Sequence, residues 1–249
     1  MHLSALSYGM YYGGYGMHGY RMLWDPTYIL VVIGVLLSLF ASVKVKSTFN
    51  KYSNVRSAGG MTGAQVAQRI LSYAGIHDVT IVRVSGSLTD HYNPKKKEVA
   101  LSETVYGRNS VAAVAVAAHE CGHVIQHANH YAPLSIRSAL VPIANFGSGA
   151  SWFIIIAGLI FSMQPLVTIG ILLFSAAVLF QVVTLPVEFN ASRRALGILQ
   201  DTGILGTNEG KAAGKVLRAA ALTYVASAAA AILQLLRLIL LFGRNNRDR

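Results

Sequence analysis

The chain has 249 residues, of which 53% are hydrophobic and only 12% are charged, and its mean hydropathy is +0.48. This composition is too apolar for an ordinary soluble domain, and it indicates an integral membrane protein. The net charge is +11, from 21 Lys and Arg against 10 Asp and Glu, but because no nucleic-acid-binding motif accompanies this excess, we attribute it to basic cytoplasmic loops and expect no nucleic acid as a partner.

The chain begins with a tail and a short apolar run. Residues 1–26 are rich in Gly and Tyr, and this composition predicts an irregular N-terminal tail. The uncharged run at 27–43 is followed by lysines, and its length is near the lower limit for a helix that crosses a bilayer. We therefore predict the first membrane helix at 27–43.

The polar part of the chain, 44–140, is predicted to be the catalytic region. Within it, 61–76 has the apolar spacing of an amphipathic helix, and 79–86 alternates like a strand. Residues 91–102 contain a turn followed by a second predicted strand. A capped helix is expected from about 110 to 129.

The remaining segments alternate between apolar and polar. Residues 141–185 hold two apolar runs separated only by Gln164 and Pro165, which predicts a tight membrane hairpin. A polar helix is expected at 186–218. The last segment, 219–249, is predicted to be an apolar helix with a basic tail, and this helix can either cross the membrane or lie in its interface.

The distribution of Lys and Arg predicts the orientation. Basic residues follow the first and third apolar runs, whereas the link between the second and third runs has none. By the positive-inside rule, 44–140 and 186–218 both lie in the cytoplasm. The predicted fold class is therefore mainly α: a multi-pass membrane protein with three or four membrane helices and a small α+β region.

The motif HECGH places two histidines and a glutamate in the helix expected at 110–129. His119 and His123 are four residues apart, about 40° around a helix, so both imidazoles can bind one metal ion. Glu120 projects beside them and can hold a metal-bound water for attack on a carbonyl, usually that of a peptide bond. The alternative is a buried helix that contains two histidines by chance, but a buried carboxylate needs a partner.

A catalytic zinc ion usually takes three protein ligands. His127 lies about 80° around the helix from His119, which makes it a poor third ligand. The acids that remain as candidates are Asp90, Glu98, Glu103, Glu188 and Asp201. Glu188 is the best of them, because the membrane hairpin returns the chain to the face on which the HECGH helix lies. The alternative role for Glu188 is a favourable charge at a helix N-terminus.

Several separate motifs occur in an order that is similar to a known family. HECGHVIQH, LTDHYNP, LSETVYG and LPVEFNASRRAL resemble the YugP family of neutral zinc metallopeptidases, which are bacterial membrane proteins. The resemblance covers the first apolar run and most of the chain from 46 to about 220. It implies a peptidase of the bacterial plasma (inner) membrane, with one Zn2+ per chain and peptide or protein substrates, membrane proteins among them.

A more distant resemblance, to HtpX-type gluzincin peptidases, implies a zincin-like catalytic region. It also implies His119, His123 and Glu188 as zinc ligands and Glu120 as general base. HtpX-type motifs have an acid four residues after the glutamate, where this chain has Ser192, so the groups that orient the ligands must differ.

Four further residues are candidates for the surroundings of the site. Asn190 or Ser192 can orient a histidine, whereas Asp90 and His91, which lie in a motif shared with the family, can contact substrate or a ligand. A turn-forming Asp and an exposed His are equally good explanations for the second pair. We also expect the stretch 99–106 to provide a strand edge that binds substrate.

Two other functions compete with the peptidase. A site-2-type intramembrane protease needs its HExxH motif within a membrane span and a later Asp ligand, for which Asp201 in LQDTG is a poor match. A non-enzymatic membrane scaffold with a vestigial metal site does not need Glu120. The sequence predicts neither the oligomeric state nor the cleavage preference.

Overall fold

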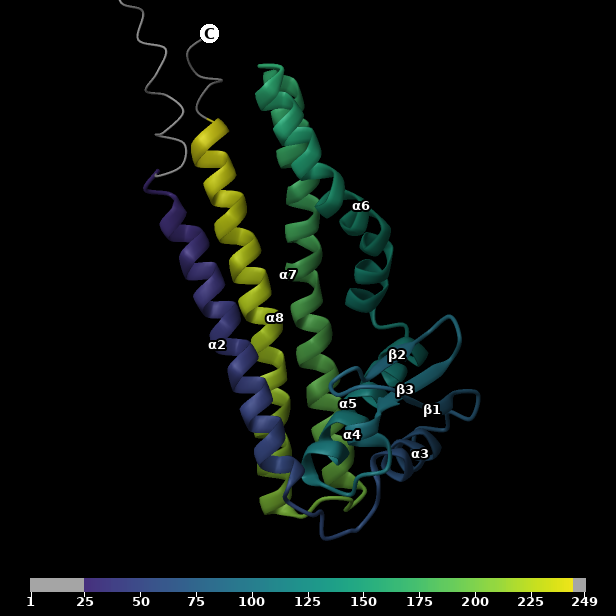
Figure 1. Cartoon of the computed structure of the whole chain (residues 1–249). Helices are drawn as coiled ribbons and strands as arrows, with labels where there is room; N and C mark the ends of the chain where they lie inside the picture. Colours follow the sequence, from purple (N-terminus) through teal and green to yellow (C-terminus); the bar gives the residue numbers. More distant parts are fainter. Residues whose placement is uncertain (1–24, 244–249) are drawn as a thin grey trace, which may run out of the picture.

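The computed structural model describes residues 25–243, so the expected tail at 1–26 and the basic C-terminal end lie almost wholly outside the described residues. Within that range the chain is mainly helical, with a small three-stranded sheet beside one end of the long helices (Figure 1). It contains four helices that are long and apolar enough to cross a membrane. The predicted mainly helical membrane fold is confirmed, with four such helices rather than three.

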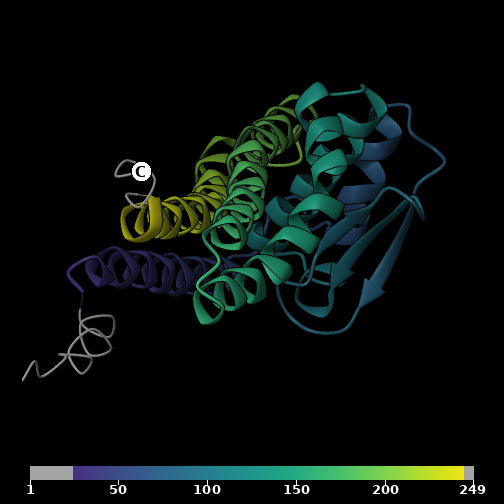
Figure 2. The same cartoon turned by 90° about the horizontal axis from the view of Figure 1, so that it is seen from above.

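The first and last of these helices, α2 (Tyr28–Ser53) and α8 (Thr207–Phe242), lie side by side in both views (Figures 1 and 2). A Cβ atom on Gly34 would lie 3.2 Å from Ala230, so the two backbones approach closely. Two turns further along α8, Arg237 pairs with Asp25 at 3.2 Å. The last apolar run is therefore a long helix packed on the first one, and its length suits a membrane crossing.

The predicted membrane hairpin is formed by α6 (Ala132–Ile160) and α7 (Gln164–Asp201). Glycines allow the two helices to touch: a Cβ atom on Gly147 would lie 2.7 Å from the Leu173 carbonyl oxygen. The two helices pack against each other along the predicted hairpin, although α6 begins well before residue 141.

One prediction about this part of the chain is wrong. No new helix begins near Pro186, because α7 continues through that proline from the apolar run into the polar segment. Proline removes one backbone N–H from the helix, yet membrane helices tolerate this loss when neighbouring helices pack around it. We call 164–185 the membrane half of α7 and 186–201 its polar half. Glu188, in the polar half, is thus joined rigidly to the hairpin.

The sheet contains β1 (Thr80–Val84), β2 (His91–Asn93) and β3 (Glu98–Ser102), in the order β1-β3-β2. β3 pairs with β1 in parallel and with β2 in antiparallel orientation. The expectation that 99–106 supplies a free strand edge is therefore wrong. The apolar side chains of β3 are buried, so this strand lies at the centre, and the chain then turns into the short helix α4 (Glu103–Tyr106).

Two capped helices complete the polar region. α3 (Gly63–Tyr73) begins with a capping box between Thr62 and Gln65, and α5 (Val111–Ala128) begins where Ser110 accepts a hydrogen bond from the Ala113 N–H. α5 is rich in small residues and is buried on almost every side. It packs against both α3 and α7. The HECGH motif therefore lies in the core, next to the polar half of α7.

Candidate metal centre

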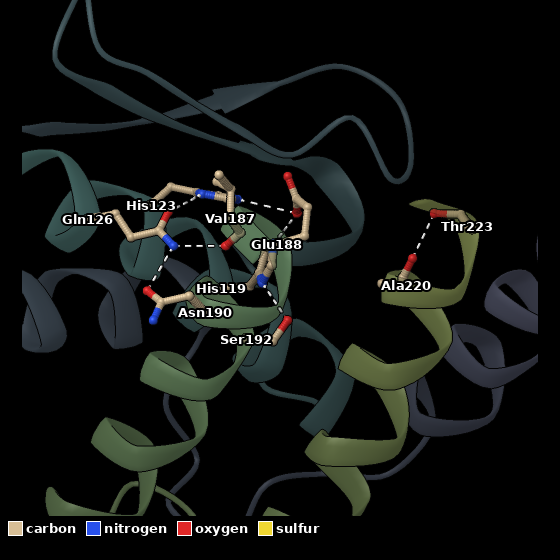
Figure 3. Close-up of polar contacts among 9 residues, drawn as sticks. All are labelled: His119, His123, Gln126, Val187, Glu188, Asn190, Ser192, Ala220 and Thr223. Carbon is tan, nitrogen blue, oxygen red and sulfur yellow. Dashed lines mark hydrogen bonds and ion pairs between the residues drawn. The ribbon is translucent and has the colours of Figure 1, made fainter. Parts of the chain in front are cut away.

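Three side chains from two helices meet at one point. His119 and His123 project from α5, and Glu188 projects from the polar half of α7 (Figure 3). Glu188 Oε2 lies 3.2 Å from His119 Nε2 and 3.6 Å from His123 Nε2. Each of the three residues offers a ligand atom within 4.8 Å of those of the other two. The structure therefore brings together the three residues that the sequence suggested as a ligand set.

These distances suit a single tetrahedral ion. Ligands bonded to zinc at about 2.0–2.2 Å lie about 3.4 Å apart in a tetrahedron, and the two distances from Glu188 to the histidines fall on either side of that value. Two imidazoles and one carboxylate are also the donor set of one class of catalytic zinc site. The residues present therefore fit a zinc ion.

A glycine inside the motif makes this meeting of helices feasible. A Cβ atom on Gly122 would lie 2.6 Å from the carbonyl oxygen of Ala191, closer than real Cβ contacts allow. The backbones of α5 and α7 therefore touch at Gly122 and Ala191, within one turn of the histidines and of Glu188. Any larger residue at position 122 must push the two helices apart, and Glu188 away from His119 and His123.

A chain of hydrogen bonds fixes the tautomer of His123. Arg194 Nε donates to Asn190 Oδ1 at 2.8 Å, so that oxygen is an acceptor, and Gln126 Nε2 donates to it at 3.0 Å and to the Val187 carbonyl at 2.8 Å. Gln126 Oε1 therefore faces His123 Nδ1, 3.0 Å away (Figure 3). Because Oε1 can only accept, Nδ1 carries the proton, and the lone pair of His123 is on Nε2, the atom beside Glu188.

His119 is held in a similar way by one of the predicted residues. Ser192 Oγ lies 3.1 Å from His119 Nδ1 (Figure 3). This contact directs Nε2 of His119 toward Glu188, as Gln126 does for His123. Asn190, the other candidate, touches neither histidine in the hydrogen-bond network and acts on His123 through Gln126.

Glu120 lies in a pocket of ≈ 170 Å³ that opens next to the triad. The pocket is lined by residues from β2, α5, α6, α7 and α8, among them His123 and Glu188. Burial raises the pKa of the Glu120 carboxyl above its usual range, while the two histidines oppose this shift. A carboxylate with a raised proton affinity is suited to accept a proton near neutral pH.

Asp90 and His91 line the same pocket. Asp90 accepts hydrogen bonds from the backbone N–H of Ser102, at 2.7 Å, and from its hydroxyl, at 2.9 Å. Burial raises the pKa of Asp90, against the effect of these two bonds. Asp90 thus ties the start of β2 to the end of β3, and His91 is an exposed residue at the mouth of the pocket.

The other candidate ligands lie outside the triad. His127 Nδ1 contacts the Tyr92 hydroxyl at 3.2 Å, Glu103 pairs with Arg83, and Asp201 is exposed at the end of α7. Cys121 is fully buried, and burial raises the pKa of its thiol. Its sulfur lies 3.7 Å from the Ala67 carbonyl oxygen on α3, so Cys121 packs behind the site.

Three residues near the site were not found by reasoning from the sequence. Gln126 is fully buried behind His123, and its signal was its position one turn after that histidine. Arg137 on α6 and Tyr224 on α8 both line the pocket. In the sequence, Arg137 was noticeable only as a cation just before an apolar run. Nothing near Tyr224 in the sequence indicated that it would line the pocket.

The chain is similar to known proteins over most of its length. A family model described as "Putative neutral zinc metallopeptidase" matches residues 27–243. The chain is 47% identical over 222 residues to a protein of Bacillus subtilis (strain 168) named "Putative membrane protease YugP", and the match covers 89% of this chain and 98% of that protein. No solved structure matches the chain.

Proposed function

Since the chain belongs to the "Putative neutral zinc metallopeptidase" family, we propose that it is a zinc-dependent membrane endopeptidase that hydrolyses peptide bonds. The observation that carries the proposal is the meeting of His119, His123 and Glu188 at distances that suit one zinc ion, with the Glu120 carboxylate in the adjoining pocket. One Zn2+ per chain, held by these three residues in a zincin-like region, satisfies this donor set.

Zinc bound there supplies Lewis acidity, which lowers the pKa of water and polarises a carbonyl group. Glu120 takes a proton from the attacking water as the water oxygen bonds to the peptide carbon. It then delivers that proton to the leaving nitrogen as the C–N bond breaks, so the products are a carboxylic acid and an amine, which ionise to a carboxylate and an ammonium group. Gln126 and Ser192 hold the two imidazoles in position during this exchange.

Two donors in the pocket are suited to the negative charge that develops on the carbonyl oxygen. The Nε atom of Arg137 is buried without a hydrogen-bond partner, and among residues 25–243 Arg137 has no ion-pair partner. Tyr224 brings a phenolic hydroxyl from α8 into the same pocket. Donors that are oriented before the reaction stabilise such charge without further rearrangement.

The edge of β2 is the best place for a substrate strand. β2 pairs with β3 on one side, and it is the last strand of the sheet on its other side. His91 and Tyr92 of this strand line the pocket that contains Glu120. A peptide that pairs with the free edge of β2 would pass directly over the pocket, as in recognition by strand addition.

The site is proposed to face the cytoplasm of a bacterial cell, close to the plasma (inner) membrane. The basic ends of α2 and α8 lie at the same end of the long helices as the polar region (Figure 1), as the positive-inside rule requires for a cytoplasmic face. Substrates are then peptides or proteins that reach this face, membrane proteins among them. α5 is not one of the four candidate spans, which argues against cleavage inside the bilayer.

The test compares wild type with Glu120→Gln, using the full chain purified in detergent. Zinc is measured by elemental analysis, and peptide cleavage is followed on a fluorogenic peptide library. We expect about one zinc per chain in both proteins, and a roughly 10²–10⁴-fold loss of cleavage in the variant because its general base is gone. Glu103→Gln, an exposed glutamate on α4, is the matched control and retains activity.

Three results would contradict the proposal. Wild-type protein that binds no zinc would remove the metal chemistry altogether. Zinc-loaded wild type that cleaves nothing would favour the scaffold with a vestigial metal site. Glu120→Gln that cleaves as well as wild type would show that Glu120 is not the general base.

A further inference from the structure

A second hollow, far larger than the pocket that contains Glu120, lies between α2 and α8. Its volume is ≈ 570 Å³, and four cations line it: Lys44 and Lys51 from α2, and Lys215 and Arg218 from α8. Hydroxyl groups of α2 also line it, including that of Thr48. We call this hollow the basic groove. It shares no lining residue with the pocket that contains Glu120.

The spacing of these residues explains why they share one hollow. Lys44, Thr48 and Lys51 follow each other at intervals of four and three residues, so they lie along one face of α2. Lys215 and Arg218 are three residues apart on α8, on a face that meets α2. Because α2 and α8 lie side by side (Figures 1 and 2), cations from two distant parts of the chain surround one space.

Residues 25–243 do not neutralise these charges. Among residues 25–243, none of the four cations forms an ion pair, since the ion pairs of that range involve other residues. Four like charges around one hollow repel each other and produce a positive potential that attracts an anion. The adjacent hydroxyl groups supply the neutral donors that complete the recognition of an oxyanion.

The depth of the groove indicates which anion it meets. Lys44 follows directly after the apolar part of α2, and Arg218 comes just before the apolar part of α8, so the groove lies where the headgroups of a bilayer begin. Leu222 lines the groove on its apolar side. On α2, the exposed side chains of Phe40 and Val43 lie one turn before Lys44 and Ser47 of the groove, toward the apolar part of the helix. An acyl chain can lie along these side chains while its phosphate group occupies the basic end.

We propose that the basic groove binds the phosphate group of an anionic phospholipid. Basic pockets between membrane helices on the cytoplasmic side are suited to anionic headgroups. Such a lipid joins α2 to α8 by neutralising cations on both helices. The site does not depend on the peptidase reaction, because none of its residues lines the zinc pocket.

The experiment uses the full chain in a neutral detergent and counts bound lipid by native mass spectrometry. The probes are dioleoylphosphatidylglycerol, which is anionic, and dioleoylphosphatidylcholine, which has no net charge. We expect phosphatidylglycerol to bind in preference, and Lys51→Gln with Lys215→Gln to weaken its binding roughly ten-fold or more. The matched control, Lys46→Gln with Lys211→Gln, removes two exposed lysines of the same helices outside the groove and retains binding.

A charge-preserving pair separates binding from folding. Lys51→Arg with Lys215→Arg is expected to bind phosphatidylglycerol as wild type does, and all variants are compared after size-exclusion chromatography shows the same monodisperse peak. Equal losses in the groove variant and its control would overturn the proposal, as would equal binding of the two lipids. Calorimetric binding of inorganic phosphate at millimolar concentration, without preference for phosphatidylglycerol, would also overturn it, because the ligand would then be the free anion.

Discussion

The two halves of α7 make close contacts with different partners and by different means. In the membrane half, glycines and apolar side chains pack against α6, with Gly147 of α6 against the Leu173 carbonyl. In the polar half, Gly122 of α5 touches Ala191 just as closely, but hydrogen bonds through Gln126 and Ser192 surround that contact. One continuous helix thus packs against α6 by shape alone in its first half and against α5 by shape plus hydrogen bonds in its second.

The difference shows what each half contributes to the site. Between apolar helices there is little hydrophobic driving force in a bilayer, so close packing of small residues holds the hairpin together. The proposed metal centre needs more, because each ligand must present one particular atom in one direction. The hydrogen bonds of the polar half provide that direction. The hairpin returns the chain to α5, so that Glu188 comes within reach of the two histidines. The predictions below test this division by its effect on zinc binding.

The largest effect is expected from Glu188→Ala in the polar half. Removal of one of the three proposed ligands should weaken zinc binding well beyond the roughly 10–100-fold that the loss of an outer partner costs. The control is Thr184→Ala, one turn earlier on the same helix, where a buried hydroxyl donates only to the Phe180 carbonyl. Elemental analysis should find little zinc in the first variant and wild-type zinc in the second. A wild-type amount of zinc in Glu188→Ala would show that Glu188 is not the third ligand.

The next effect is expected from Gly122→Ala, which adds one carbon at the crossing of α5 and α7. That carbon meets the Ala191 carbonyl at 2.6 Å, and because backbone atoms cannot rotate away, overpacking should cost about 1–3 kcal/mol of stability. Gly197→Ala adds the same carbon to the polar half with nothing within 4 Å, so it should be neutral or stabilise the helix by up to about 1 kcal/mol. Thermal unfolding in detergent measures the stability, and elemental analysis measures the zinc, which should fall only in Gly122→Ala.

The sequence was sufficient to predict that His119, His123 and Glu188 come together, because simple rules of helix spacing and chain reversal applied to these residues. The four-residue spacing of His119 and His123 is a property of any helix, and two adjacent apolar runs return the chain to the same face, which brought Glu188 into reach. The continuity of α7 through Pro186 could not be predicted, because whether a helix tolerates a proline depends on the helices packed around it.

Other features escaped prediction for a related reason. The central position of β3 depends on β1 pairing in parallel with it across a long connection, and no local pattern specifies such a pairing. Tyr224 reaches the pocket only because α8 packs against α7. The position of Arg137 could be predicted only from the correct start of α6, and the apolar pattern placed that start several residues too late.

A smaller effect is expected from Gln126→Leu, which keeps the size of the side chain but removes its amide. His123 Nδ1, the Val187 carbonyl and Asn190 would each lose a partner. The tautomer of His123 would no longer be fixed, so zinc affinity should fall roughly 10–100-fold. Competition with a chromophoric chelator measures the affinity, and Gln68→Leu, the same change on an exposed face of α3, is the control. An unchanged affinity would mean that the packing of α5 on α7 is enough to orient the histidine.

The smallest effect on zinc affinity is expected from changes where α6 contacts the membrane half of α7. Gly147→Ala places a carbon 2.7 Å from the Leu173 carbonyl, whereas Gly149→Ala, two residues later on α6, meets nothing within 4 Å. The first change should destabilise the hairpin by about 1–3 kcal/mol and the second should not, as thermal unfolding in detergent will show. Zinc affinity of the folded protein should be the same in both, because the contact of α5 with the polar half of α7 is untouched. If Gly147→Ala instead lowers zinc affinity as Gly122→Ala does, the hairpin also determines where Glu188 lies, and the two halves of α7 do not act separately.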